Sequence, residues 1–148
     1  MTNPAAPHVP HRLGYLLKHA QLAFTEQSAP ALAPLEINGR ELAVLTVLST
    51  PEPLAQQQAA SRLGVDRTTM VDLVDELERK LLVQRQPDPG DRRRNLIHLT
   101  ASGQTALTQG TLAAQKAEQQ FLSALSPVEQ EAFKSMLRRI LGLDHAPS

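Results

Sequence analysis

The chain has 148 residues, of which 41% are hydrophobic, and its 15 Lys and Arg residues balance 15 Asp and Glu residues, so its formal net charge is zero. This length and apolar content predict one folded domain, and the absence of cysteine excludes disulfides, thiolate metal sites and cysteine nucleophiles. No apolar run approaches the length of a membrane span and the N-terminus lacks the pattern of a secretory signal, so a cytosolic protein without a membrane partner is expected.

The chain begins with a segment that lacks hydrophobic periodicity. Residues 1–10 contain three prolines and are predicted to form a flexible arm. From residue 11, apolar side chains at helical spacing predict a helix to about residue 30, because Pro30 and Pro34 are expected to end it. The apolar positions are Leu13, Leu16, Leu17, Ala20, Ala23 and Phe24.

A second helix is expected to begin at Asn38. Asn38 lies three residues before Glu41, and this spacing is typical of a capping box, in which two backbone N–H groups are satisfied reciprocally. Pro51 and Pro53 should end this helix because proline lacks the N–H that a helix needs. The residues that follow, 54–63, predict a short third helix.

A tight turn separates the third and fourth predicted helices. Gly64 stands where a helix end favours the left-handed backbone conformation, and Asp66 is a natural N-cap. The fourth helix is expected over residues 67–82. Five apolar residues at helical spacing should form its buried face: Met70, Leu73, Val74, Leu77 and Leu81.

A charged hairpin follows the fourth helix. Residues 83–86 and residues 95–99 predict two short strands. The segment between them, residues 87–94, reads Pro-Asp-Pro-Gly-Asp-Arg-Arg-Arg and predicts the turn. Three successive positive charges are therefore expected at the tip of the hairpin.

Two further helices complete the predicted pattern. One runs from residue 101 to about residue 125 and carries small residues that allow close helix packing: Ala106, Gly110, Ala113, Ala114 and Ala117. The next has Ser126 as N-cap, Pro127 at the first position and Glu129 at the third. Its expected apolar face consists of Val128, Ala132, Phe133, Met136, Leu137 and Ile140. This face exceeds what one small domain covers, so a homodimer is predicted; the alternative is that these helices complete a monomeric core.

The third and fourth predicted helices match a helix-turn-helix. Ala60 is small enough for a close helix crossing, Gly64 tolerates the turn, and Met70 and Leu73 face inward. The opposite face of the fourth helix carries Thr68, Asp72, Asp75 and Arg79. The start of this face suits the major groove of double-stranded DNA, where hydroxyls and an acidic side chain can contact base edges. The predicted DNA contacts are Arg67, Thr68, Thr69 and Asp72; the alternative is a plain helical hairpin with a polar outer face.

The hairpin placed directly after a helix-turn-helix predicts a winged helix. A cationic wing tip can lie along phosphates or enter a narrow minor groove, where the potential is strongly negative. The predicted wing contacts are Asp91, Arg92, Arg93 and Arg94. The alternative is a solvated loop, which most charge runs are.

The segment GVDRTTMVDLVDELERKLLVQRQPDPGDRRRNLIHLTASGQ resembles the core of the MarR family, the multiple-antibiotic-resistance type of winged-helix regulator. The Asp-Arg-Arg of the wing, the following Leu-Thr and Gly103 match the family pattern. The resemblance implies a mainly α fold with a small β-hairpin wing, forming a single domain over residues 11–148. The winged helix-turn-helix core is expected at about 38–100, between dimerisation helices at about 11–30 and 101–143.

The resemblance also implies roles for the wing residues and for the whole chain. Arg93 corresponds to the characteristic wing arginine, Asp91 orients it, and Arg92 and Arg94 add phosphate or minor-groove contacts. The family often has glycine just before the Leu-Val that begins the first wing strand, whereas this chain has Leu81, so a different helix cap is expected there. The implied function is sequence-specific regulation of transcription, by default repression, by a homodimer on an inverted repeat.

An effector site is a further expectation from the family. Its members often bind small aromatic or phenolic anions between the dimerisation helices and the winged domain. The corresponding residues here are Tyr15, Lys18, His19, Leu22 and Arg40. Cationic and hydrogen-bonding groups beside apolar walls suit an organic acid. The alternative is that Tyr15 and His19 are ordinary half-buried helix residues.

No cofactor, metal site or enzymatic activity is predicted. The chain has no phosphate-binding glycine loop, nucleophile elbow or metalloprotease helix. His8 and His11 have no carboxylate nearby and do not favour a metal pair. The remaining rival function is a helical interaction module without DNA binding, and the presence of Thr68, Thr69 and the three arginines argues against it.

Overall fold

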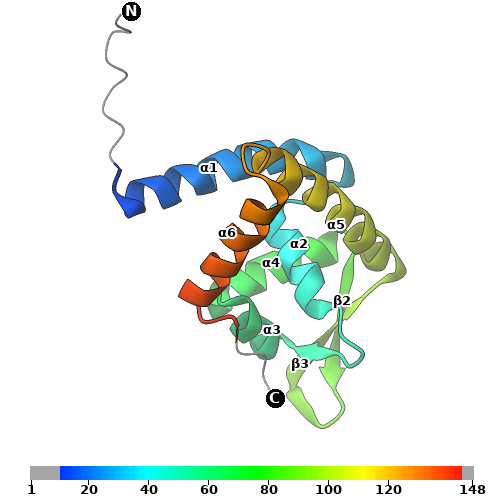
Figure 1. Ribbon diagram of the computed structural model, residues 1–148. Coiled ribbons are helices and arrows are strands. Elements are labelled where there is room, and N and C mark those ends of the chain that lie inside the picture. Colours follow the sequence, from blue (N-terminus) through cyan, green and yellow to red (C-terminus); the bar gives the residue numbers. More distant parts are fainter. Residues whose placement is uncertain (1–10, 145–148) are drawn as a thin grey trace, which may run out of the picture.

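The computed structural model describes residues 11–144, so the predicted arm at residues 1–10, which includes His8, lies outside the described residues. The fold is mainly helical with a small antiparallel sheet, as the sequence predicts (Figure 1). The elements are α1 (Leu13–Leu32), the 3₁₀ helix η1 (Ala33–Leu35), α2 (Gly39–Leu48), β1 (Leu54–Ala55), α3 (Gln56–Leu63), α4 (Arg67–Arg79), β2 (Val83–Asp88), β3 (Asp91–Leu99), α5 (Ala101–Phe121) and α6 (Pro127–Ile140).

The described helices form two groups. α2, α3 and α4 pack with the sheet, while α1 and α5 lie side by side, and the N-terminal half of α1 projects beyond the rest of the molecule (Figure 1). The rings of Phe24 and Phe121 meet edge to face at 5.2 Å and join α1 to α5. None of the helices between residues 11 and 144 is long and apolar enough to cross a membrane.

The hydrophobic core lies between α2, α4 and the sheet. Its largest fully buried side chains include Leu45, Met70, Leu77 and Ile97, and the C-terminal Leu32 of α1 joins them. Burying a large aliphatic side chain contributes about 1.5–3 kcal/mol. The inner face predicted for the fourth helix is therefore confirmed at Met70 and Leu77.

Three helices begin with the predicted N-caps. The Asn38 side chain accepts the Glu41 N–H at 2.9 Å, and Glu41 Oε1 accepts the Asn38 N–H at 3.1 Å. Asp66 caps α4, and Ser126 caps α6 in the same reciprocal way as Asn38 caps α2. Each cap satisfies N–H groups that the first helical turn leaves without partners.

The predicted end of α1 is wrong, because Pro30 lies inside the helix and does not end it. Proline removes one backbone hydrogen bond in a helix interior. In α1 the helical hydrogen bonding continues past Pro30, since the Ala33 N–H donates to Ala29 O. The burial of Leu32 stabilises the last turn. The chain then tightens into η1, which contains Pro34.

Residues 54 and 55 form a short strand instead of the predicted first turn of a helix. Leu54 pairs with Ile97 and Ala55 pairs with Leu96, so β3 is the central strand in the order β1-β3-β2. Both residues of β1 are buried. Pairing with a distant strand thus overrides the local helical pattern, and α3 begins at Gln56.

The predicted end of α5 at residue 125 is also wrong, since the helix stops at Phe121. Residues 122–125 turn toward α6. The Gln130 side chain donates to the carbonyls of Leu122 and Leu125 at 3.1 and 3.0 Å, which holds this turn from the first part of α6.

The end of α4 differs from the prediction at Leu81. The helix stops at Arg79, and Leu81 adopts a left-handed conformation with φ 62°. The N–H of Leu82 bonds to Leu77 O and the N–H of Leu81 bonds to Glu78 O, which is the Schellman pattern of helix termination. Leu81 is consequently exposed and does not belong to the buried face where the sequence placed it.

The start of α5 docks directly on this turn. The Thr100 hydroxyl donates to Leu81 O at 2.7 Å, and the Thr100 N–H donates to Leu82 O at 3.1 Å. A Cβ at Gly103 would collide with the Leu82 carbonyl oxygen, so only glycine allows this approach. Close packing of α5 explains why the chain accepts a left-handed leucine there.

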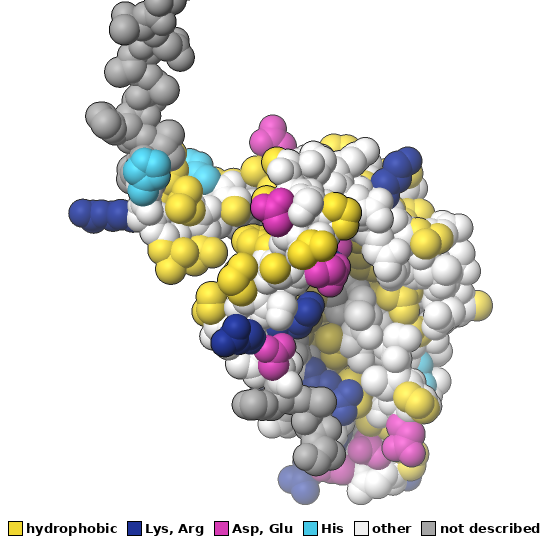
Figure 2. Space-filling view, viewed as in Figure 1, with side chains coloured by type: hydrophobic (Ala, Val, Ile, Leu, Met, Phe, Trp, Pro, Cys, Tyr) yellow, Lys and Arg dark blue, Asp and Glu magenta, His cyan; other side chains and the backbone are white. Residues whose placement is uncertain are grey.

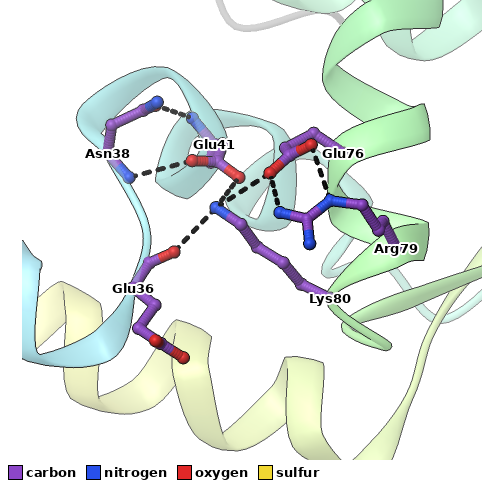
Figure 3. A network of polar contacts seen from close by, with 6 residues as sticks. All are labelled: Glu36, Asn38, Glu41, Glu76, Arg79 and Lys80. Atoms are coloured by element: carbon purple, nitrogen blue, oxygen red, sulfur yellow. Dashed lines mark hydrogen bonds and ion pairs between the residues drawn. The ribbon is translucent and has the colours of Figure 1, made fainter.

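A polar network also joins the end of α4 to the start of α2 (Figure 3). Lys80 Nζ donates to the Glu36 carbonyl and to Glu41 Oε2, both at 2.7 Å. The Glu41 side chain is only 3% exposed and that of Lys80 is 20% exposed. Removing one partner of a buried ion pair costs about 3–5 kcal/mol, so this pair fixes α4 against α2.

We predict that Leu81→Gly stabilises the protein. The left-handed conformation costs a non-glycine residue roughly 1–2 kcal/mol, and the extra chain entropy of unfolded glycine offsets about 0.5–1 kcal/mol of the gain. The Leu81 side chain is 74% exposed, so little burial is lost. The free energy of unfolding, measured by urea denaturation at fixed protein concentration, should rise by about 0.5–1 kcal/mol.

Gly103→Ala is the opposing control, since its new methyl group meets backbone and not solvent. It should lower the free energy of unfolding. If the Leu81→Gly protein is less stable than the wild type, the contacts of the leucine side chain stabilise the fold by more than the left-handed backbone costs, and the prediction is wrong.

Candidate nucleic-acid interface

The segment from α3 to α4 is a helix-turn-helix, as predicted. Gly64 adopts φ 71°, and the N–H of Val65 bonds to Ala60 O at 3.1 Å to close the turn. Ala60 is 7% exposed at the helix crossing, and Met70 is fully buried beneath α4. The small residue, the turn glycine and the buried methionine thus occupy the places that the motif requires.

The first turn of α4 presents most of the predicted contact residues. Arg67, Thr68 and Asp72 are exposed, whereas Thr69 is half-buried. The Thr69 N–H donates to the Asp66 carboxylate at 2.6 Å, and this bond lowers the pKa of Asp66. The Asp66 side chain caps α4 and so orders the helix start that carries the contact residues.

Two residues predicted on the free face of α4 are held in ion pairs. Asp75 Oδ1 lies 2.7 Å from an Nη atom of Arg85 on β2, and Arg79 is hydrogen-bonded to Glu76. Bonding to Arg79 lowers the pKa of the Glu76 carboxyl. Asp72 and Asp75 thus differ: Asp75 has a strong partner, and no ion pair involves Asp72 among residues 11–144.

The wing, defined as β2 with β3, has an irregular outer end. Asp88 lies opposite Asp91, whereas the preceding Pro87 lies opposite Asn95. The residues between Asp91 and Asn95 have no opposite residue in β2 and form a bulge, which we call the arginine bulge: Arg92, Arg93 and Arg94. Their predicted place in a turn is wrong, because strand pairing extends to Asp88 and leaves a tighter turn closed by the bond from Gly90 N–H to Asp88 Oδ1.

The arginine bulge is loosely held by acidic neighbours. Asp91 Oδ1 accepts the Arg93 N–H at 3.1 Å and lies 3.7 Å from Arg93 Nε, while the Arg93 side chain is 96% exposed. Arg94 Nε lies 3.9 Å from Asp88 Oδ2. These contacts suit the predicted orienting role of Asp91, which stays a prediction, and they leave the guanidinium groups accessible.

A cleft of about 420 Å³ separates the wing from the helix-turn-helix. Arg67 from α4 and Arg93 and Arg94 from β3 line it, so residues far apart in the sequence meet at one concave surface. Four polar residues of the lining were not predicted from the sequence: Gln56, Gln57, Ser61 and Asn95. No pattern distinguished them from other surface polar residues; only the pairing of β1 with β3 brings α3 beside the wing.

The residues predicted for an effector site are not enclosed within one chain. On the projecting part of α1, the ring centroids of Tyr15 and His19 lie 4.0 Å apart. Lys18 and Leu22 of the same helix are exposed. Arg40 lies elsewhere, in the first turn of α2. Three hollows of the described part of the chain, the cleft beside the wing among them, are lined by other residues. Within the same range, no group of three or more His, Asp or Glu side chains could hold a metal ion.

Solved structures with this fold include complexes. The transcriptional repressor CouR bound to a 23-mer DNA duplex aligns with a TM-score of 0.85 and 29% identity, covering 95% of this chain and 99% of that one. CouR from Rhodococcus jostii RHA1 bound to p-coumaroyl-CoA aligns with a TM-score of 0.78 and 25% identity over 96% and 100% of the two chains. PcaV from Streptomyces coelicolor, in complex with its natural ligand, aligns with a TM-score of 0.78 and 28% identity, covering 95% of this chain and 99% of that one.

Sequence comparison agrees with the structural likeness. The family model described as the MarR family matches residues 37–94, the segment from before α2 to the arginine bulge. A protein assigned as the transcriptional regulator of the hcr operon in Thauera aromatica is 32% identical over 133 residues, which cover 89% of this chain and 80% of that protein. With its helix-turn-helix, its wing and these relatives, the chain belongs to the MarR family of transcriptional regulators.

Proposed function

We propose that two copies of this chain form a repressor that binds an inverted-repeat DNA duplex and that a small aromatic or organic acid releases. The observation that carries this proposal is the cleft that brings Arg67 of α4 together with Arg93 and Arg94 of the wing. In this proposal the protein acts by binding, without catalysis.

The proposed DNA surface compensates for the lack of net charge. A chain of zero net charge has no bulk attraction for DNA, so local cations must supply it. The arginine bulge places three such cations in succession on an exposed strand. Exposed Thr68 and Asp72 on the neighbouring helix can contact base edges, while the arginines contact phosphates or a minor groove.

The proposal of a dimer rests on apolar surface that one chain leaves uncovered. Val128 and Ile140 of α6 are 80% and 77% exposed, and no residue of α6 is buried. Figure 2 shows hydrophobic side chains gathered over α6 and the projecting part of α1. Contiguous apolar surface of this kind marks interaction sites. A symmetric pair would place two copies of α4 about 34 Å apart, one turn of the double helix.

The proposal of an effector rests on relatives and on α1. CouR is solved with p-coumaroyl-CoA and PcaV with its natural ligand, and both share this fold. In this chain Tyr15 and His19 offer stacked rings beside Lys18, on the part of α1 that a partner chain would cover. A partner that closes this surface would create an apolar site with a cation, which suits a small aromatic acid.

We predict that the arginine bulge supplies affinity and that α4 supplies discrimination. Duplexes selected from a random pool should converge on an inverted repeat. Replacing Arg92, Arg93 and Arg94 by alanine should weaken binding to selected and scrambled duplexes alike, because phosphate contacts carry no sequence information. Each lost phosphate contact should flatten the plot of log affinity against log salt by about 0.9, doubled in a dimer.

Thr68→Ala is the matched variant on α4. It should change which base is preferred, by roughly 1–3 kcal/mol per lost good contact, with little change in the salt slope. A wing without the three arginines that keeps full affinity and salt slope would show that the bulge is only a solvated surface. Failure of every duplex to bind would favour a helical interaction module.

We predict that α6 joins two copies of the chain. Val128→Asp with Ile140→Asp should turn a particle of twice 16.2 kDa into a single chain, measured by light scattering, because two buried charges without partners cannot be accommodated. Leu81→Asp is the control, since Leu81 is as exposed but lies at the end of α4. A wild-type protein that is monomeric at micromolar concentration contradicts the dimer.

We predict that small aromatic acids lower the affinity for DNA. A panel of benzoic and phenolic acids and an aromatic acyl-CoA should contain a compound that raises the melting temperature and weakens DNA binding by a coupling of about 1–3 kcal/mol. His19→Ala should reduce this response without abolishing DNA binding. If no compound in the panel has either effect, the effector proposal is wrong, while the DNA-binding proposal remains.

A further inference from the structure

We propose that Arg85 is a positioning residue: it holds the wing at a fixed angle to α4, so that the arginine bulge and the first turn of α4 meet DNA as one rigid surface. This inference rests on the proposed DNA binding. It assigns a role to Asp75 and Glu78 as well, since these carboxylates of α4 hold the Arg85 side chain.

Arg85 of β2 is bonded to two helices at once, α3 and α4. Its guanidinium lies 2.7 Å from Asp75 Oδ1 and 3.3 Å from Glu78 Oε1, and its backbone N–H donates to Glu78 Oε2 at 2.9 Å. Its Nε donates to Gln56 Oε1 on α3 at 3.1 Å, and an Nη donates to Val71 O at 3.4 Å. One side chain thus ties β2 to both helices of the helix-turn-helix.

The spacing of the acceptors makes this attachment rigid. Val71, Asp75 and Glu78 are separated by four and three residues, so they lie in a row along one face of α4. A guanidinium is planar and holds its donors in a fixed fork, and all three of its nitrogens are used here. The attachment therefore restrains both the distance and the tilt of β2 relative to α4.

Arg85 differs from the arginine bulge in exposure and partners. Its side chain is 19% exposed, whereas that of Arg93 is 96% exposed. Because its donors are already engaged by the protein, Arg85 is not a phosphate contact, although it is a cation near the proposed DNA surface. Its effect on DNA must pass through the elements that it joins.

The position of Arg85 within the sheet explains why the wing needs such a restraint. Arg85 lies opposite Ile97 of β3, and Ile97 lies opposite Leu54 of β1, so the three residues form one of the two rows that span all three strands. The other row, Gln86, Leu96 and Ala55, lies next to it toward the wing tip, and beyond that row β2 and β3 pair only with each other. An isolated two-stranded hairpin is marginally stable in water. Arg85 holds the wing one row before the end of the third strand.

Positioning and simple electrostatics predict opposite results for Asp75→Asn. Asp75 is a carboxylate near a surface proposed to meet phosphates, so removal of its charge alone should strengthen DNA binding. If Asp75 acts by holding Arg85, the same change loosens the wing and weakens binding. The Asp75 side chain is 58% exposed, so the variant should remain folded.

The test compares Asp75→Asn with Asp72→Asn. Both changes remove one carboxylate charge from α4, but of these two residues Asp75 is the one that pairs with Arg85. On a scrambled duplex, Asp72→Asn should bind slightly more tightly than the wild type, and Asp75→Asn should bind about three- to tenfold more weakly. Glu78→Gln should change affinity in the same direction as Asp75→Asn. Equal or tighter binding by Asp75→Asn overturns the inference.

The same Asp75→Asn change, made in a protein without the wing arginines, shows whether its effect on DNA affinity depends on the wing. In a protein whose arginine bulge is replaced by alanines, Asp75→Asn should change affinity less than about twofold, because there is no longer a wing contact to misplace. A general loss of stability would weaken binding equally in both backgrounds. An undiminished effect in the alanine background therefore contradicts the positioning role.

The restraint can also be measured without DNA. The chain has no cysteine, so Gly90→Cys places a single spin label at the wing turn. The electron spin resonance spectrum should report faster local motion in Asp75→Asn than in the otherwise identical protein, at equal melting temperature. Unchanged motion overturns the inference even if DNA binding is intact. If the wild type binds no duplex, the proposed function fails, and this spectrum still decides whether Arg85 restrains the wing.

Discussion

Lys80 at the end of α4 donates to the buried Glu41 carboxylate at the start of α2, and the placement of α4, the second helix of the helix-turn-helix, depends on this pair. Glu41 also completes the cap of α2, so a single carboxylate serves a helix start and a tertiary contact. Two residues after Lys80, the carbonyl of Leu82 accepts the Thr100 N–H and lies against Gly103, so the start of α5 packs there. The C-terminal end of α4 is thus fixed from two sides, and its first turn is presented outward.

The charges of the chain are divided between structure and surface. Lys80 and Arg85 are largely covered and bonded to carboxylates, so they add nothing to the attraction of a polyanion. Arg67 and two residues of the arginine bulge, Arg93 and Arg94, are exposed around one cleft. A neutral protein can in this way present a local positive surface, because four of its carboxylates, Glu41, Asp75, Glu76 and Glu78, are paired with the two covered cations.

Local hydrogen bonding explains which parts of the fold were predictable. Asn38, Asp66 and Ser126 cap helices through bonds to residues three positions away, and Gly64 supplies the left-handed turn, so short sequence windows contain all the necessary information. The wing arginines were recognisable for the same reason, as a run of adjacent residues. Their arrangement as a bulge was not, because it follows from the register between Pro87 and its opposite strand.

The sequence by itself determined the starts of the helices that a side chain caps, the helix-turn-helix pattern and the identity of the cationic residues, since each depends on neighbours along the chain. Tertiary structure alone decided that Leu81 turns left-handed beneath α5 and that β1 pairs with β3. It also decided that Asp75, which belongs to a free helix face in the sequence, is held by Arg85. These contacts join residues about ten to forty positions apart, and their energies depend on geometry that helical or strand periodicity does not contain.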